Sequence, residues 1–463
     1  MGKRLPILDQ PASSIDTDGH RNYVHPADVS GRFTTLRTVV SLALIGVYVA
    51  LPFVKIGGRP AVFLDIVHRR FHLFGATFNA NDFWLVFFLI TGIGFALIVL
   101  TSVLGRVWCG FACPQTVFLD GIFRRIERLI DGPRNERIRR ARGPLTFDKA
   151  WRFVTKNAIF LALCFALAHV FLSYFVSLPS LATIVREPPS AHPEAFGWVV
   201  AFTLVTFADF AWFREQVCLI ICPYGRLQSV MTDRDTIVIG YDEKRGEPRG
   251  RATDPQAGDC VDCHRCVQVC PTGIDIRNGL QIDCIGCAAC VDACDEVMTR
   301  IDRPVGLIRY DSQNRFDGGV RRLLRPRVVL YAVLGVVGLS VGIFAASGRV
   351  AFEAHLLRSA GAVFVATDAD VQNPVRLHLV NKRDEPIVLD VVNRSDAEIS
   401  EVPEVREVRL APGEARYVPI LLTVSRERMR PGLSARLDVS IRGERDEHAR
   451  VDLRFLGPVR RTR

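Results

Sequence analysis

Residues 260–294 read CVDCHRCVQVCPTGIDIRNGLQIDCIGCAACVDAC, and this stretch decides how the rest of the chain is interpreted. It contains the pattern C-x2-C-x2-C-x3-C twice, separated by residues 271–283, with Pro271 directly after the first repeat. Three cysteines at this spacing bind one four-iron cluster from a tight loop, and the fourth cysteine of each repeat ligates the other cluster. The pattern therefore predicts a bacterial dicluster ferredoxin-like domain with two 4Fe–4S clusters.

The crossed pattern also predicts which cysteines hold each cluster. The first cluster is expected on Cys260, Cys263, Cys266 and Cys294. The second is expected on Cys284, Cys287, Cys290 and Cys270. Zinc also takes four thiolates from paired C-x2-C units, but a zinc ribbon does not need a third C-x2-C step or the whole pattern twice. Crossing keeps two clusters close together, which suits electron transfer.

Four further cysteines form two copies of the motif C-x3-C-P, namely Cys109, Cys113, Cys218 and Cys222. Cysteines at i and i+4 share a helix face, and the following proline tends to end the helix. Each pair is therefore expected where a membrane span leaves the membrane on the cytoplasmic side. Such thiolates could hold Cu(I), cycle between dithiol and disulfide, or hold a further cluster. Alternatively, they pack as small apolar residues.

The composition points to a membrane protein. The 463 residues are 49% hydrophobic, with a mean hydropathy of +0.19. A helix needs about 20 apolar residues to cross a bilayer. Five runs predict an α-helical transmembrane bundle of about five spans, at residues 38–54, 83–105, 157–185, 197–222 and 328–348. The polar segment before them lacks the features of a removable signal peptide, so the first helix is expected to stay.

Lysine and arginine near the spans indicate the orientation, because cytoplasmic connections carry an excess of both. Residues 106–152 and 223–327 are rich in arginine, whereas residues 180–196 contain one basic side chain, Arg186. The amino terminus and the clusters are therefore expected in the cytoplasm of a bacterium, with the chain in its inner membrane. Four basic residues on the predicted outer side argue weakly against this: Lys55, Arg59, Arg69 and Arg70.

The net charge of +10 does not indicate a nucleic-acid-binding protein. Its basic residues lie beside membrane spans, where attraction to anionic lipid and fixing of topology explain them. We expect no nucleic acid among the partners.

After about Arg349 the chain alternates apolar and polar residues with period two and lacks cysteine. Turn residues such as Asn381, Pro412-Gly413 and Pro431-Gly432 separate these runs, which predicts an antiparallel β-sandwich. The absence of cysteine from this outer part also argues against a disulfide framework. We expect a binding or assembly module here.

These observations divide the chain into five segments. A polar cytoplasmic tail is predicted at 1–37 and a four-helix membrane region with the C-x3-C-P motifs at 38–223. The cytoplasmic dicluster domain is predicted at 224–327, a fifth transmembrane helix at 328–348, and a periplasmic domain at 349–463.

Three other side chains are candidates without an assigned role. Asp209 lies within the fourth predicted span, where an ionisable group is a functional hypothesis by default. It could have a proton or metal role, or it could pair with Arg214 or Glu215, which could also pair with each other. His68 and His72 have the i, i+4 spacing of a helical metal site, although a solvated basic loop is the simpler interpretation.

Assembled, these motifs make the chain resemble the cytochrome c oxidase accessory protein family of the CcoG/FixG type. The resemblance covers most of the chain. Besides the cluster repeats, it rests on stretches that begin at Trp108 (WCGFACPQT), Phe213 (FREQVC), Cys222 (CPYGR) and Tyr241 (YDEKRGEPR). The resemblance implies that the outer β-sandwich is an immunoglobulin-like domain.

The resemblance also implies a role in assembling a cbb(3)-type oxidase, in which Cu(II) is reduced to Cu(I) for the haem–copper centre. Copper would then be handled by the four C-x3-C-P cysteines. The implied partners are a cytoplasmic electron donor, copper-delivery proteins and oxidase subunits. Two other functions stay open: a quinol- or ferredoxin-linked electron-transfer subunit of a periplasmic reductase, and a non-enzymatic copper chaperone or assembly scaffold.

Overall fold

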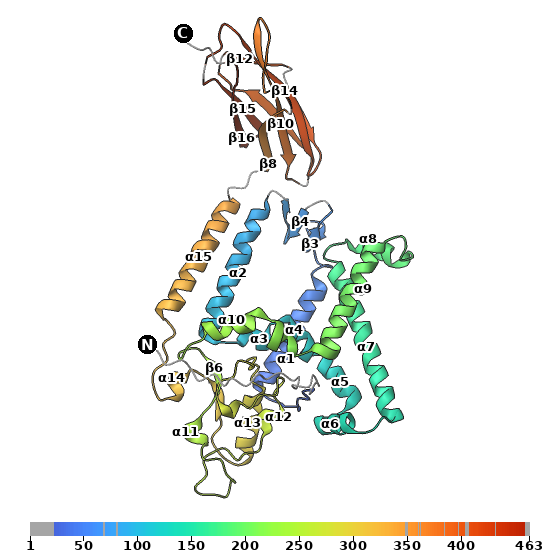
Figure 1. Cartoon of the computed structure of the whole chain (residues 1–463), viewed down its shortest axis with the longest axis vertical. Coiled ribbons are helices and arrows are strands. Elements are labelled where there is room, and N and C mark those ends of the chain that lie inside the picture. Colours follow the sequence, from blue (N-terminus) through green and yellow to red (C-terminus); the bar gives the residue numbers. More distant parts are fainter. Residues whose placement is uncertain are drawn as a thin grey trace. The chain divides into compact units, whose positions relative to one another are not determined.

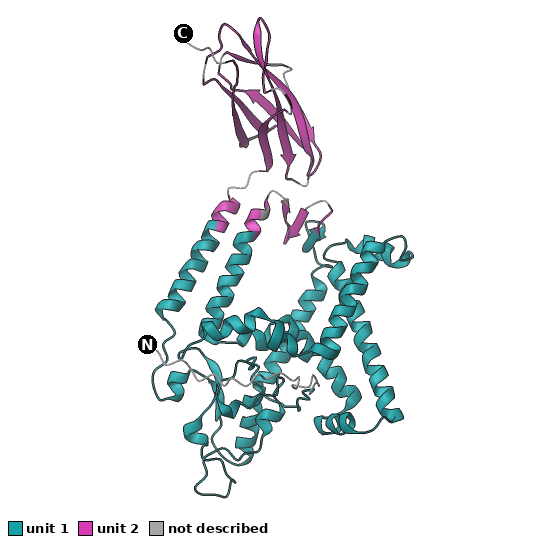
Figure 2. Ribbon diagram, in the orientation of Figure 1, with its two compact units in different colours: residues 1–64, 87–341 teal, residues 65–86, 342–463 magenta. Residues whose placement is uncertain are grey.

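The computed structural model describes residues 23–67, 70–79, 82–347, 351–359, 361, 363–383, 385–396, 398–402, 407–430 and 432–458. The chain forms two compact units (Figure 2). One contains residues 1–64 and 87–341, and the other contains residues 65–86 and 342–463.

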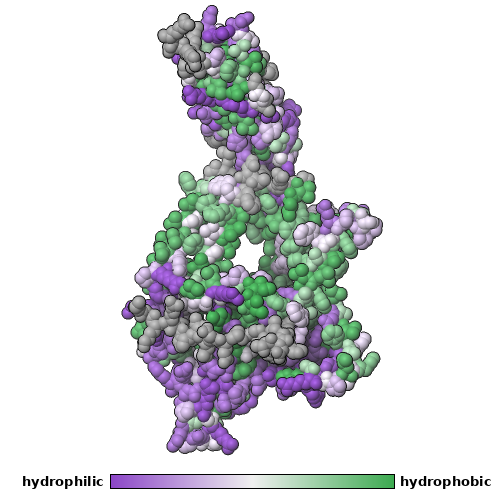
Figure 3. All heavy atoms as spheres, viewed as in Figure 1, coloured by the Kyte–Doolittle hydropathy of each residue, from purple (hydrophilic) through white to green (hydrophobic). Residues whose placement is uncertain are grey.

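Five helices in the described part of the chain are long and apolar enough to cross a membrane (Figure 1). They are α1 (Arg32–Ala50), α2 (Phe83–Leu104), α7 (Phe147–Leu172), α9 (Pro193–Ala208) extended by the π-helical η3 (Asp209–Phe213), and α15 (Pro326–Ser347). Hydrophobic surface covers α2 and α15 in Figure 3, whereas the part of the chain drawn below them is largely hydrophilic. The prediction of a helical transmembrane bundle is confirmed.

The third span differs most from its predicted bounds. It begins at Phe147, ten residues before the predicted start, and ends at Leu172. The side chain of Thr146 caps its amino terminus by accepting a hydrogen bond from the Lys149 amide. Its first turns carry Lys149, Arg152 and Lys156. The predicted start, at residue 157, follows these charges because it marks the beginning of the uncharged apolar run. The predicted end instead forms a separate helix, α8 (Leu178–Arg186).

The fourth span ends earlier than the predicted residue 222. The helix stops at Phe213 because Arg214 adopts a left-handed backbone, with φ of 52°. Arg214 is buried, and its guanidinium donates to Glu127 at 2.9 Å. A second π-helical turn, η4 (Val217–Ile221), then leads to α10 (Pro223–Met231).

Short helices connect α2 to α7. They are α3 (Val107–Phe111), α4 (Pro114–Phe118), the π-helical η2 (Leu119–Phe123), α5 (Arg124–Asp131) and α6 (Arg134–Arg142). Their apolar side chains pack against α7 and η3. Phe123 stacks on Phe210 with ring centroids 4.3 Å apart and meets Phe160 edge-on.

The cluster segment is built on a two-stranded antiparallel sheet. Strand β6 (Val238–Tyr241) pairs with β7 (Ile308–Asp311), so that residues distant in sequence close the segment. Its other elements are α11 (Glu243–Gly246), α12 (Arg265–Gln268), the 3-10 helix η5 (Ile276–Asn278), α13 (Ala289–Arg300) and α14 (Gln313–Phe316). Buried Ile239, Ile276 and Leu307 share one core with Cys260 and Cys266.

A carboxylate from the cluster segment caps the first membrane helix. Asp292, between two cluster cysteines on α13, accepts hydrogen bonds from the amides of Phe33 and Thr34 at 3.2 and 2.7 Å. Gly31 is required beside it, because a Cβ there would meet the Asp292 side chain at 2.3 Å. An anionic group at a helix amino terminus also interacts favourably with the helix dipole. The helix α1 is thereby anchored to the cluster segment.

The second unit contains the predicted β-sandwich. One sheet has the order β12-β14-β10-β8, with β9 also paired to β10, and the other has the order β13-β11-β15-β16. The strands are β8 (Phe352–Arg358), β9 (Val365–Ala366), β10 (Asp370–Asn381), β11 (Ile387–Asn393), β12 (Ile399–Val402), β13 (Glu407–Leu410), β14 (Ala415–Ser425), β15 (Ser434–Ile441) and β16 (Glu444–Arg454). Leu377, Leu389 and Leu437 are fully buried between the sheets.

Short strands follow α1. They are β1 (Lys55–Ile56), β2 (Arg59–Pro60), β3 (Val62–Asp65), β4 (Arg70–Leu73) and β5 (Ala76–Asn79). His72 lies in β4 and contacts the Thr77 hydroxyl at 2.9 Å, so the helical spacing predicted for this histidine is wrong. Its predicted partner, His68, lies outside the described residues. Within the second unit, Lys382 pairs with Asp82 and Glu353 at 3.0 and 2.5 Å.

Candidate functional site

The two cysteine repeats adopt the same unusual backbone conformation. In the first repeat, Asp262 and His264 have left-handed φ angles of 49° and 54°. In the second, the equivalent residues Gly286 and Ala288 have φ angles of 69° and 60°. Left-handed geometry is uncommon for residues with a Cβ and concentrates at functional sites. Its recurrence at both positions of both repeats indicates loops shaped for the same kind of ligand.

The two loops enclose two small cavities, each lined by a different set of cysteines. The first cavity is lined by Cys260, Cys263, Cys266 and Cys294. The second is lined by Cys270, Cys284, Cys287 and Cys290, together with Cys266 of the first set. The last cysteine of each repeat thus faces the cavity of the other repeat, which is the crossed arrangement expected from sequence.

The chemistry of both cavities suits iron–sulfur clusters. Four thiols surround each, and aliphatic side chains such as Ile276, Ile285 and Leu307 complete the walls. A single zinc ion needs sulfurs within about 4 Å of one another. Among the residues that the structure describes, no three His, Cys, Asp or Glu side chains form a group that could hold one metal ion. Thiols around a cavity, rather than converging on a point, fit a larger group.

The C-x3-C-P cysteines are placed differently from the prediction. Cys109 lies in α3, but Cys113 caps the amino terminus of the next helix, α4, with Pro114 in its first turn. Likewise Cys218 lies in the π-helical η4, and Cys222 caps α10. The two cysteines of a motif therefore do not share one helix face. The physical reason is that each proline starts a new helix instead of only ending the previous one.

The structure nevertheless brings the four thiols together. Burial raises the pKa of Cys218, and the charges of Cys113, Cys109 and Cys222 act in the same direction because these thiols are close by. Burial also raises the pKa of Cys109 to about 11, although a hydrogen bond from Gln228, whose Nε2 lies 3.4 Å from the sulfur, opposes this.

The thiol group packs directly against the second cluster loop. Cys109 and Cys218 contact a buried apolar cluster that includes Cys287, with Cys290 at its edge. The backbones of Gly110 and Gly286 also approach each other closely here, because a Cβ on Gly110 would lie 2.4 Å from the Gly286 carbonyl oxygen. Gly110 sits between the cysteines of one motif, and Gly286 sits between two cluster cysteines. Two groups of cysteines distant in sequence thus lie side by side.

Arginine side chains hold this junction together. Arg106 donates to the carbonyl oxygens of Cys284 and Gly225 at 3.3 and 2.7 Å. Arg37, from the first span, donates to the Gly110 carbonyl at 3.0 Å and pairs with Asp120 at 2.6 Å. Arg124 pairs with Asp120 and donates to the Pro271 carbonyl, next to Cys270. None of these roles was predicted, because only distance in space, not spacing in sequence, links the groups.

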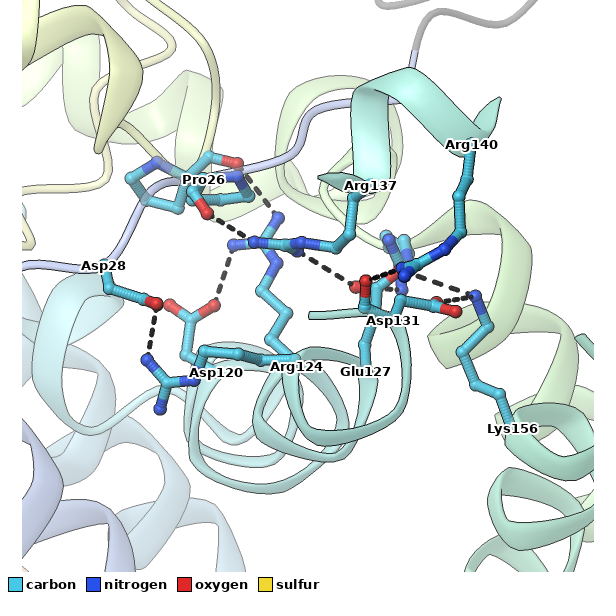
Figure 4. A network of polar contacts seen from close by, with 12 residues as sticks. Pro26, Asp28, Asp120, Arg124, Glu127, Asp131, Arg137, Arg140 and Lys156 are labelled. Atoms are coloured by element: carbon cyan, nitrogen blue, oxygen red, sulfur yellow. Dashed lines mark hydrogen bonds and ion pairs between the residues drawn. The ribbon is translucent and has the colours of Figure 1, made fainter. Parts of the chain in front are cut away.

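A buried ion-pair network continues from this junction toward α7 (Figure 4). Glu127 lies at its centre and contacts Arg214 at 2.9 Å, Arg137 at 3.7 Å and Lys156 at 3.8 Å. Burial by itself would raise the pKa of Glu127, but these positive charges outweigh it and lower the pKa to about 2. The carboxylate is therefore ionised throughout the physiological range.

The sequence suggests that Asp209 pairs with Arg214 or Glu215, but both of these residues pair with other side chains. Arg214 contacts Glu127, and Glu215 contacts Arg124 at 3.2 Å. Asp209 instead accepts a hydrogen bond of 2.9 Å from Gln115, which follows the first C-x3-C-P motif by one residue. The role of Asp209 remains a hypothesis.

Three family models match the chain. A 4Fe-4S dicluster domain matches residues 213–313 and a 4Fe-4S binding domain matches residues 83–133, which contain the first C-x3-C-P motif. The model described as an IG-like fold at the C-terminal of FixG matches residues 342–458. The chain thus carries two 4Fe–4S binding domains and an immunoglobulin-like domain.

Three curated proteins are similar over most of their length. Protein RdxA of Cereibacter sphaeroides is 38% identical over 78% of this chain and 80% of its own length. Protein RdxB of the same organism is 36% identical over 82% of this chain and 83% of its own length. The nitrogen fixation protein FixG of Rhizobium meliloti is 34% identical over 78% and 77%.

Fold and site together define an iron–sulfur electron-transfer protein with several membrane helices. Within this class, the chain belongs to the FixG family.

Replacing Gly110 by alanine is expected to damage the second cluster site. The new Cβ would have to displace backbone atoms of Gly286 and Cys287, and forced overpacking of this kind costs roughly 1–3 kcal/mol. Iron and acid-labile sulfide should fall toward half of the wild-type content in the purified protein. The matched control is Gly94→Ala in α2, where a Cβ meets nothing within 4 Å. Equal cluster content in both variants would contradict the contact.

Replacing Glu127 by glutamine is expected to destabilise the membrane unit by about 3–5 kcal/mol, because it leaves buried Arg214 and Arg137 without their counter-charge. The folded-state pKa lies below the ordinary value of 4.5, so this stabilisation is present above pH 4.5 and is lost as pH falls toward 2. Thermal aggregation of the purified protein in detergent measures the effect. The control, Glu136→Gln, removes a more exposed pair with Arg140 and should have little effect.

Proposed function

We propose that the protein binds two 4Fe–4S clusters in the two cysteine-lined cavities and reduces Cu(II) to Cu(I) at the four C-x3-C-P thiols, during assembly of a cbb(3)-type cytochrome c oxidase. The observation that carries this proposal is the packing of Cys109 and Cys218 against the loop of Cys287 and Cys290. It puts a group of soft ligands beside the second cluster cavity.

The thiol group has the chemistry that copper reduction requires. Thiolates favour Cu(I) over Cu(II), so they stabilise the product of a one-electron reduction. The clusters, when bound, would supply single electrons, one for each copper ion reduced. Gln228 fixes the position of Cys109 by its contact with the sulfur. Burial raises the pKa of the Cys113 thiol, although hydrogen bonds from the amides of Gln115 and Thr116 at the amino terminus of α4 oppose this rise.

Copper is a substrate in this proposal and not a resident ion. No group of three ligating side chains suited to one metal ion occurs within the described part of the chain. Copper would therefore gather the thiols as it binds and leave as Cu(I). Copper-delivery proteins and oxidase subunits are the proposed partners, and the immunoglobulin-like domain is the proposed assembly module. A cytoplasmic electron donor completes the scheme.

The orientation is also part of the proposal. Helices α5 and α6 carry eight arginines within residues 124–142, close to the ends of α2 and α7. By the positive-inside rule, this connection and the clusters lie on the cytoplasmic side of a bacterial inner membrane. With five spans, the immunoglobulin-like domain then lies in the periplasm.

The double variant Cys113→Ser/Cys222→Ser tests the copper chemistry. Both cysteines cap helices, and serine is a preferred capping residue, so the fold should survive. We expect normal cluster content and at least a tenfold slower appearance of Cu(I), captured by a chelator after Cu(II) is added to reduced protein without oxygen. Cys164→Ser, in the packed interior of α7, is the control.

Unchanged copper reduction in the double variant would overturn the assignment of the thiols. If the wild-type clusters stay reduced after Cu(II) is added, copper is not the electron acceptor. A subunit that transfers electrons to a periplasmic reductase would then be the better hypothesis. Stoichiometric copper binding without cluster oxidation would instead indicate a chaperone.

Alkaline phosphatase fusions test the orientation, because this enzyme becomes active only outside the cytoplasm. A fusion after residue 458 should be active, and a fusion after Gly143 should be inactive. The reverse result would place the clusters outside and contradict the proposed path of copper reduction.

A further inference from the structure

A large cavity adjoins the second cluster loop. Its volume is about 810 Å³, within the range of roughly 300–1,000 Å³ typical of pockets for organic ligands. It lies wholly in the first unit, between the end of α2, the carboxyl-terminal half of α10, strand β6 and residues 280–286. Nothing in the proposed copper chemistry uses it.

One wall of the cavity is the cluster loop itself. Cys284 and Gly286 line it, together with Arg106, whose guanidinium donates to the Cys284 carbonyl. Tyr310 also lines it, and its hydroxyl donates to the Gly286 carbonyl at 2.5 Å. A ligand in the cavity would therefore be separated from the second cluster by little more than one cysteine and its loop.

The opposite wall is formed by segments at the end of the membrane spans. Leu104 is the last residue of α2, and Val230 lies near the end of α10 with 69% of its surface exposed. The start of α15 is joined to this wall, because Arg327 donates to the Val230 carbonyl at 2.8 Å. Leu324, just before α15, is 86% exposed. The cavity thus borders on apolar surface at the level where spans end.

The lining combines apolar and polar side chains. Seven aliphatic residues contribute to it, among them Leu280 and Ile282. Ser229, Gln281 and Asn314 supply neutral hydrogen-bonding groups. Two carboxylates, Asp233 and Asp235, face the cavity as well as the two arginines, Arg106 and Arg234. This balance of charge is unfavourable for the phosphates of a nucleotide but suits a neutral aromatic head group.

We propose that this cavity binds the head group of a membrane quinol, which enters from the lipid and donates the electrons that the clusters carry. Oxidation of a quinol to a quinone releases two electrons and two protons. Two one-electron centres accommodate the electrons, and the protons pass to water. The inference rests on the proposed function only in that the clusters are the electron carriers. The electron donor is then a quinol dissolved in the membrane instead of a soluble cytoplasmic donor.

The variant Ser229→Trp adds a large side chain to the cavity wall from α10, at a position outside the cluster loops. Its matched control is Leu227→Trp, two residues away on the same helix, 51% exposed and not part of the lining. Both are made in the full-length protein with its clusters, reconstituted in lipid nanodiscs. A photoreactive azido-ubiquinone is the binding probe, and decylubiquinol is the reductant.

In the wild type and in Leu227→Trp, the probe should label peptides from residues 229–239 and 280–286. Cluster reduction by decylubiquinol should be followed by the loss of visible absorbance. In Ser229→Trp we expect at least tenfold less labelling and at least tenfold slower reduction. Dithionite should still reduce its clusters fully, which shows that they are intact.

If Ser229→Trp loses its clusters, Val230→Trp replaces it, because an exposed position tolerates a large side chain. Equal labelling in filled and control variants, or labelling only elsewhere, would overturn the proposal. So would reduction of the clusters by decylubiquinol at the same rate in Ser229→Trp and in Leu227→Trp. Copper reduction is measured separately after dithionite treatment, so a failure of the copper chemistry is distinguished from a failure of quinol binding.

Discussion

The backbone of Gly110 lies directly against the backbone of Gly286, closer than any side chain would allow. This contact joins a segment that follows a membrane span to a loop that holds cluster cysteines. Cys109 and Cys218 can approach Cys287 and Cys290 only because the two glycines let the chains meet. The proposed passage of electrons to copper depends on this close approach, because it requires both groups of cysteines in one place.

Arginines stabilise the junction and shape its electrostatics. Arg37, Arg106 and Arg124 each donate to a backbone carbonyl beside a cysteine of the site. Their charges are balanced in part by Asp120 and Glu215, which are paired rather than solvated. Burying charge is costly unless it is paired and hydrogen-bonded. Positive charge near a four-thiolate site also favours electron uptake, because cluster potentials depend on local charge and hydrogen bonding.

The second cluster cavity occupies the central position in the proposed electron path. On one side it meets the thiols of the C-x3-C-P motifs, and on another its ligand Cys284 borders the large cavity. The first cluster cavity shares Cys266 with it, but its lining includes no C-x3-C-P cysteine and no residue of the large cavity. A two-electron donor and a one-electron acceptor can be coupled by two such centres. In the proposed path, two clusters therefore suit the chemistry better than one.

The sequence alone determined the features that depend on local spacing. Cysteine intervals predicted both cavities, long apolar runs predicted five membrane helices, and period-two alternation predicted the β-sandwich, because each depends on the geometry of one short segment. Helix ends were less predictable: Lys156 lies inside a span because Asp131 and Glu127 pair with it. Only the tertiary structure decided that four scattered thiols meet beside one cluster loop. Contacts such as Gly110 with Gly286 join residues far apart in the chain, and no periodicity records them.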